Sequence, residues 1–166
     1  MNRSFKSLNA QEALHVAVFI EERDAAIYHQ FAELFSEFHD PESLEVASTF
    51  WEMAHEEGEH GTLLQNLYLQ RYGTAPCAMT EEDICEFIEV PNPEEISGLL
   101  GGQTVGNRSP RERALEIAIS AEQNAQTYYG RLSVETKDPQ LQSLYRDLAQ
   151  FEGAHTESLQ RKLEAA

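Results

Sequence analysis

An internal repeat restricts the folds that are open to this chain of 166 residues. Residues 12–21 align without a gap with residues 113–122, and the match continues from Tyr28 to Tyr129. Apolar residues recur at helical spacing in both copies, as in Leu14, Ala17 and Val18. The repeat therefore predicts two equivalent helices in the two halves of the chain.

The segment that follows each copy ends in the motif Glu-x-x-His. Each of these segments begins with aspartate and proline, which favour the N-cap and the first position of a helix. Residues three apart share one face of a helix, so each motif places a carboxylate beside an imidazole. The two motifs occupy corresponding positions of the repeat: Glu57/His60 and Glu152/His155.

Two further Glu-x-x-His pairs occur in the chain and do not recur. His15 aligns with Glu116, and His55 aligns with Gln150. In so acidic a chain a single pair carries little information, and we interpret these two pairs, Glu12/His15 and Glu52/His55, as exposed pairs on helix surfaces.

The helical segments predict an all-α fold with one domain spanning residues 1–166. A chain of this length suffices for one domain with a core. The expected helices cover about 9–39, 41–72, 110–136 and 139–163. The connection between the first two expected helices is very short, which favours an antiparallel arrangement of these two helices side by side. Residues 73–109 are rich in proline, glycine and acidic residues, with short helical turns expected near 80–89 and 93–100. They form a long connector that could cross the length of an antiparallel four-helix bundle.

Composition excludes several classes of partner. The net charge of −17 argues against nucleic acid and against an anionic membrane. Cys77 and Cys85 form neither a metal-binding Cys-x-x-Cys nor a disulfide framework, and no role is predicted for them. No apolar run approaches the ~18 residues of a membrane span, and no secretory leader is evident. We therefore expect a cytoplasmic protein that is not associated with a membrane.

Acidic residues interrupt the apolar stripe of every predicted helix. Glu21 and Glu122 align in the repeat, whereas Glu22, the alternative to Glu21, lacks such a match. A buried carboxylate is costly unless it is paired or binds a metal. Four carboxylates with two imidazoles suit two divalent cations, iron or manganese, as in the di-metal carboxylate bundles. The candidate ligands are Glu21, Glu57, His60, Glu122, Glu152 and His155.

The chain resembles the rubrerythrin-like branch of the ferritin-like superfamily. The resemblance covers all four helices and is carried by four motifs: Ala13-Leu14-x-x-Ala17-x-x-x-Glu21 with Tyr28, Glu56-Glu57-Gly-Glu-His60, Ala114-Leu115-x-x-Ala118-x-x-x-Glu122 with Tyr129, and Phe151-Glu152-Gly-Ala-His155. It implies a ferritin-like antiparallel four-helix bundle with a long crossover connector and a di-iron centre.

The resemblance also implies a role for each ligand. Glu57 and Glu152 correspond to the catalytic carboxylates that bridge two metals. The remaining ligands divide between the two metals as Glu21 with His60 and Glu122 with His155.

Other residues are expected around this centre. Tyr28 and Tyr129 would donate hydrogen bonds that orient carboxylates. Rubrerythrins carry a further carboxylate where this chain has Ala125. Asp24, at the equivalent place in the first helix, could substitute for it from the other half of the repeat, but we expect Asp24 to lie exposed or behind the ligands.

The implied function is the reduction of hydrogen peroxide or dioxygen at a di-iron centre. The rubredoxin-type module of rubrerythrins is missing, so electrons would come from an external donor protein. Alternatives are an iron-binding, iron-delivery, storage or ferroxidase protein, a di-manganese site like that of a catalase, and an acidic bundle without metal. A homodimer is also expected, since related bundles often pair.

Overall fold

Six helices and no strand form within the residues that the computed structural model describes, 8–74, 77–102 and 106–166. The all-α prediction is thereby confirmed. The helices are α1 (Ala10–Ser36), α2 (Pro41–Tyr72), α3 (Glu81–Cys85), α4 (Pro93–Leu100), α5 (Pro110–Glu135) and α6 (Pro139–Ala165).

The four long helices begin at side-chain caps. The side chains of Asn9 and Ser109 each accept a hydrogen bond from the backbone N–H of the third residue of the helix, which is a glutamate. The side chain of that glutamate accepts a hydrogen bond from the backbone N–H of the cap residue. Asp40 and Asp138 cap α2 and α6 ahead of a proline at the first position. These contacts satisfy backbone N–H groups that would otherwise lack partners, and they fix where each helix starts.

The first helix is shorter than the sequence suggests. It was expected to reach about residue 39, but α1 ends at Ser36. His39 adopts a left-handed backbone conformation with φ of 57°, which a helix cannot continue. This residue reverses the chain just before Asp40 caps α2.

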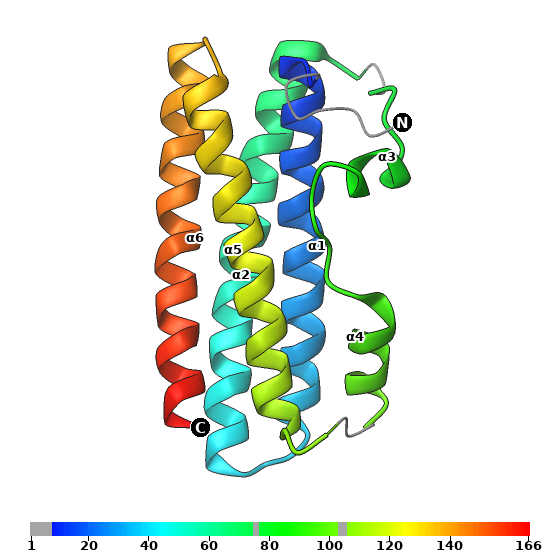
Figure 1. Ribbon diagram of the computed structural model, residues 1–166, viewed down its shortest axis with the longest axis vertical. Helices are drawn as coiled ribbons and strands as arrows, with labels where there is room; N and C mark the ends of the chain where they lie inside the picture. Colours follow the sequence, from blue (N-terminus) through cyan, green and yellow to red (C-terminus); the bar gives the residue numbers. More distant parts are fainter. Residues whose placement is uncertain (1–7, 75–76, 103–105) are drawn as a thin grey trace.

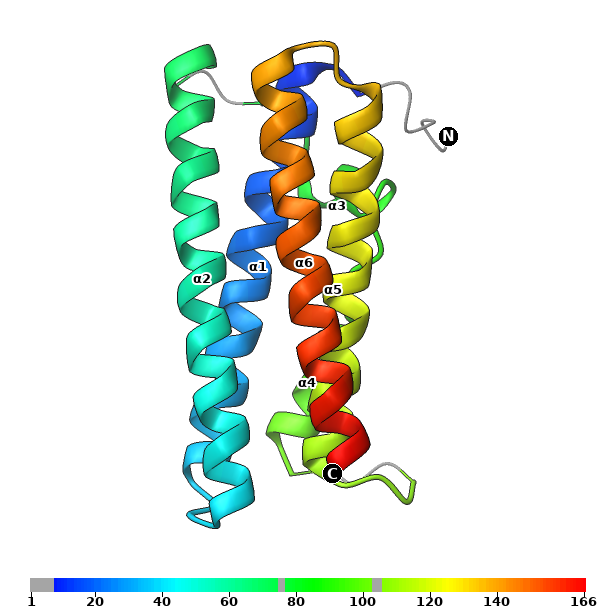
Figure 2. The ribbon, with the colours of Figure 1, turned by 90° about the vertical axis from the view of Figure 1, so that its left-hand side faces the viewer.

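The long helices run side by side along the length of the molecule (Figures 1 and 2). α1 packs mainly on α2, and α5 packs mainly on α6. Within each pair the helices are antiparallel, while α2 and α5 run in the same direction, so a long connection must join them (Figure 1). None of the described helices is long and apolar enough to cross a membrane.

The connector follows the side of α1 from one end of the molecule to the other (Figure 1). Its two short helices, α3 and α4, fall where helical turns were expected. Ile84 of α3 and Leu99 of α4 are buried against the long helices. Residues 75–76 and 103–105 of the connector lie outside the described residues. The connector therefore covers apolar surface in addition to linking the helices.

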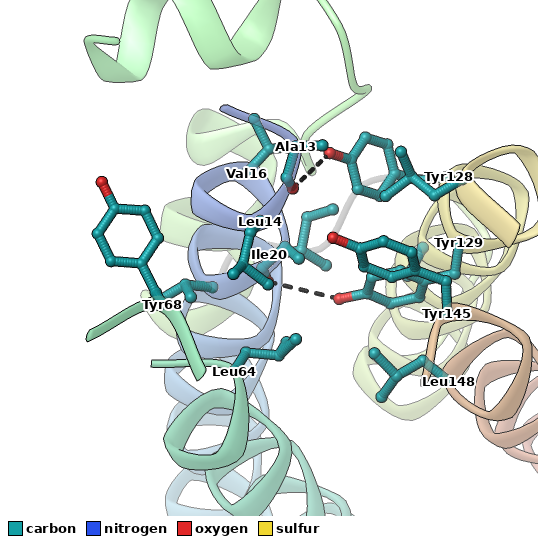
Figure 3. Close-up of a cluster of buried hydrophobic side chains, with 14 of the residues drawn as sticks. Ala13, Leu14, Val16, Ile20, Leu64, Tyr68, Tyr128, Tyr129, Tyr145 and Leu148 are labelled. Carbon is teal, nitrogen blue, oxygen red and sulfur yellow. Dashed lines mark hydrogen bonds between the residues drawn. The ribbon is translucent and has the colours of Figure 1, made fainter. Parts of the chain in front are cut away.

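The core divides into two apolar clusters with acidic residues between them. One cluster includes Leu14, Leu64, Tyr129 and Leu148. Figure 3 shows Tyr128, Tyr129 and Tyr145 of this cluster reaching from α5 and α6 toward α1. The other lies toward the opposite end of the helices and includes Phe31, Phe50, Leu115 and Leu159. In sequence, each long helix carries a buried glutamate between its contributions to the two clusters: Glu21, Glu57, Glu122 and Glu152.

Candidate metal centre

All six predicted ligands meet in the layer between the two clusters. Two groups of donor atoms form, and the atoms within each group lie within 4.8 Å of one another. Both groups contain Glu57 and Glu152. The first group adds Glu21 and His60, and the second adds Glu122 and His155. We call these places the Glu21 position and the Glu122 position.

The carboxylates of this centre are removed from water and incompletely hydrogen-bonded. The four glutamates are at most 1% exposed. Among the described residues, one oxygen each of Glu21, Glu57 and Glu152 lacks a hydrogen-bond partner. Buried polar atoms in folded proteins almost always have partners. Two of these oxygens, Glu21 Oε2 and Glu57 Oε1, lie 3.3 and 3.0 Å from a histidine nitrogen, but the four carboxylates outnumber the two histidines in this layer. Such a gathering of buried carboxylates indicates a place for cations, and this donor set fits them.

The two tyrosines of the repeat tie the helix pairs together. Tyr28 of α1 donates a hydrogen bond to Glu122 of α5, and Tyr129 of α5 donates one to Glu21 of α1. Both tyrosines are fully buried. Each hydroxyl therefore holds one oxygen of a carboxylate in the opposite helix and leaves its other oxygen to face the centre.

The imidazoles approach the centre through the same nitrogen. His60 Nδ1 lies 3.3 Å from both Glu21 Oε2 and Glu57 Oε2. His155 Nδ1 lies 3.0 Å from Glu57 Oε1 and 3.2 Å from Glu122 Oε2. Glu57 thus touches both histidines, as a carboxylate shared between two cation positions would.

Burial raises the pKa of Glu21 and Glu152 well above the ordinary value, and neighbouring carboxylates add to the increase for both. Burial also acts to raise the pKa of Glu57, but hydrogen bonds with His155, His60 and Glu21 outweigh it and bring the pKa to about 2. Without a cation, the fold therefore favours the anion of Glu57 and the neutral acids of Glu21 and Glu152.

The histidines are held in their charged form by the same carboxylates. Burial acts to lower both pKa values, but contacts with Glu21 and Glu57 raise the pKa of His60 to about 10. Contacts with Glu122 and Glu57 raise the pKa of His155 to about 11. Two imidazolium ions thus replace part of the positive charge that the glutamates require, and a bound cation would displace their protons.

Asp24 is buried, in keeping with the second of the two places expected for it, behind the ligands. It belongs to neither donor group and instead accepts hydrogen bonds from Arg23 Nε and Nη2 at 2.9 and 2.8 Å. Burial raises its pKa to about 7, against the lowering effect of Arg23, and the charges of Glu122 and Glu57 raise it further. Asp24 therefore lies behind the ligands, on the side of the Glu122 position.

Sequence reasoning assigned no role to two residues that contact the histidines. Glu56 Oε2 lies 2.6 Å from His155 Nε2, on the side of the ring away from the centre. Phe151, which takes the place of Glu56 in the repeat, packs on His60 with ring centroids 5.1 Å apart. Both residues directly precede a ligand, Glu57 or Glu152, and that adjacency was the signal available.

Other sequence expectations can be located around the centre. Glu22, the alternative to Glu21, is exposed. His55 is also exposed and pairs with Glu59 on the surface of α2. The close approach of α1 to α2 occurs at Gly61, where an added Cβ would meet Glu21 Cβ at 3.4 Å. A methyl group at this position would make ordinary van der Waals contact with the ligand helix.

The fold and the site together define an all-α protein with a buried cluster of glutamates and histidines that could hold metal ions. Comparison of the chain with protein-family models, with curated proteins and with solved structures finds no match. The resemblance to rubrerythrins therefore stays a prediction, and the physical properties of the site must support any functional proposal.

Proposed function

We propose that the chain is a ferritin-like four-helix bundle that holds a dinuclear iron centre and uses it for redox chemistry. One observation carries the proposal: two groups of buried donor atoms share Glu57 and Glu152 and are completed by separate Glu and His residues. This arrangement matches the ligand set of di-metal carboxylate bundles. An acidic bundle without metal would leave several buried carboxylates unexplained.

In this proposal the ligands have distinct roles. Glu57 and Glu152, which belong to both donor groups, would hold both cations. Glu21 and His60 complete one position. Glu122 and His155 complete the other. Two divalent cations supply four positive charges for four carboxylates, and the imidazoles then bind as neutral ligands after losing their protons.

The protein's own residues would prepare the site for a reaction at its exposed side. Tyr28 and Tyr129 hold the terminal carboxylates in place from the core. The side chains of His60 and His155 are 16% and 12% exposed, so a molecule the size of peroxide approaches from the histidine side. Iron bound here would supply two electrons for the reduction of hydrogen peroxide or dioxygen.

Oxygen and imidazole donors suit iron and manganese better than a thiolate-preferring metal. We favour iron because of the resemblance to rubrerythrins, and we place an external electron donor protein among the partners. A second copy of the chain is a further proposed partner. The net charge of −17 favours attraction of cations and disfavours nucleic acid.

The reaction of the iron-loaded protein tests this proposal. The protein is loaded anaerobically with Fe(II) and mixed with hydrogen peroxide or with dioxygen, and the di-ferric absorbance is followed in stopped flow. A faster reaction with peroxide, together with turnover when a reductant is supplied, supports a peroxidase. The control is Glu59→Gln, which removes an exposed carboxylate of α2 outside the centre.

Other results would change the function proposed. Equal or faster oxidation by dioxygen would indicate an oxidase or ferroxidase. Two bound irons without turnover, released readily to a chelator, would indicate iron handling. Failure to bind iron with stoichiometric binding of Mn(II) would indicate a di-manganese centre. If Glu57→Ala binds as much metal as the native chain, the centre has been assigned to the wrong residues.

A further inference from the structure

We propose that the two cation positions are unequal, and that the Glu122 position fills first because Glu56 holds His155. The inference rests on the dinuclear centre proposed above and adds an order of binding and a positioning residue. It starts from the repeat, which relates the two positions residue by residue. Both positions share the bridging carboxylates and each has its own glutamate, histidine and tyrosine.

The repeat is broken on the outer side of the histidines. Glu56 and Phe151 occupy corresponding places, one residue before the shared carboxylates. Glu56 accepts a hydrogen bond from His155 Nε2 at 2.6 Å, whereas Phe151 presents an aromatic ring to His60 at an interplanar angle of 63°. Among the described residues, His60 Nε2 has no acidic partner.

This difference changes the quality of each histidine as a ligand. A carboxylate on the outer nitrogen keeps the proton there, leaves Nδ1 free to bind a cation and fixes the orientation of the ring. It also makes the imidazole more basic. His155 has these advantages in the Glu122 position. His60 packs on an uncharged ring and lacks them. Removing such an outer partner typically weakens metal affinity about 10- to 100-fold.

The charge of Glu56 contributes less to the difference between the two positions than the orientation that Glu56 gives to the His155 ring. The Glu56 side chain is 49% exposed, so water and salt screen its field at the cation. Asp24, whose counterpart is Ala125, also lies on the side of the Glu122 position, but Arg23 pairs with it. The hydrogen bond between Glu56 and His155 is therefore the main source of the inequality.

Anaerobic calorimetric titration with Fe(II) tests the inference on the whole chain. We expect two binding steps in the native protein, with dissociation constants that differ about 10-fold or more. Glu56→Ala, which removes the acceptor of His155 Nε2, should weaken the first step by that factor and bring the two constants together, and Glu56→Asp should restore part of the difference. Phe151→Glu should strengthen the second step by giving His60 an outer carboxylate. Glu59→Gln removes one charge from the same helix and should leave both steps unchanged.

A crystal structure at one Fe(II) per chain locates the first cation. Anomalous density at the Glu122 position is expected. Density at the Glu21 position, equal occupancy of both, or an unchanged first step in Glu56→Ala would overturn the inference, while two bound irons would still support the dinuclear function. If the native chain binds no Fe(II), or if Glu57→Ala binds it as well as the native chain, the dinuclear function itself fails and the inference fails with it.

Discussion

Replacing Glu152 by glutamine should stabilise the metal-free protein and remove its response to metal. Burial raises the pKa of Glu152 well above its ordinary 4.5, so the folded state keeps a proton on this carboxyl to higher pH than the unfolded chain does. The unfolded chain releases that proton above pH 4.5, and each further pH unit costs the folded state at most about 1.4 kcal/mol. Glutamine does not ionise, so the variant does not lose this stability as pH rises.

The magnitude follows from this slope. Between pH 5 and pH 7 the advantage of Glu152→Gln over the native chain should grow by at most about 3 kcal/mol. For a chain of this size that corresponds to about 5–10 °C in melting temperature. Near pH 4.5 the two proteins should have nearly equal stability, because the unfolded carboxyl is then half protonated.

Glu57→Gln supplies a matched comparison with the opposite sign. The pKa of Glu57 is lowered to about 2 by the two histidines, so the fold favours its anion at neutral pH. Neutralising it should destabilise the metal-free protein, on the order of 3 kcal/mol at pH 7. Both variants should lose the stabilisation that metal gives the native chain, which is about 2.7 kcal/mol at a free metal concentration 100 times the dissociation constant.

Urea unfolding followed by circular dichroism, with chelator or with Mn(II), measures these differences across pH 4.5–7. Glu152→Gln and Glu57→Gln should shift the metal-free midpoint in opposite directions. A loss of stability of similar size in both variants, independent of pH, would show that the carboxylates serve the fold itself. Such a result would refute the claim that the buried carboxylates cost the metal-free fold stability because their cations are missing.

Three further predictions concern pH, the tyrosines and the helix caps. The metal-free protein should lose stability as pH rises above about 6.5. The pKa values of His60 and His155 are about 10 and 11 in the folded state, so the unfolded chain releases these protons first. Thermal melts in chelator between pH 6 and 9 measure this loss, and a melting temperature that rises with pH would contradict it. Tyr28→Phe and Tyr129→Phe should each weaken metal affinity about 10- to 100-fold in a chelator competition, because Glu122 or Glu21 loses the hydroxyl that donates a hydrogen bond to it. Unchanged affinity would show that the hydroxyls do not position the ligands. Ser109→Ala should lower the free energy of unfolding by about 1 kcal/mol through loss of a cap, with metal affinity unchanged.

The long helices could be predicted from the sequence because their signals are local. A cap such as Asp40 followed by proline fixes a helix start without reference to the rest of the chain. The end of α1 was predicted less well. The sequence does not show that His39 adopts a left-handed conformation, because any of several residues before Asp40 could have reversed the chain.

The ligands could be found because the repeat separated Glu57 and His60 from similar pairs on the surface. Contacts between helices could not be found in the same way. The hydrogen bond from His155 to Glu56 joins residues 99 positions apart, and no spacing rule predicts it. The sequence left Asp24 open between an exposed place and one behind the ligands for a related reason: a charged residue near an apolar stripe is usually exposed, but here Arg23 accompanies it into the interior.

Metal stoichiometry tests the central claim most directly. The native chain and the double variant Glu57→Ala/Glu152→Ala are loaded anaerobically with Fe(II), freed of excess metal and assayed for iron per chain, with circular dichroism to confirm folding. The account predicts two irons per native chain and none in the folded double variant. One iron or none in the native chain, or two irons retained by the variant, would contradict a dinuclear centre built on these shared carboxylates.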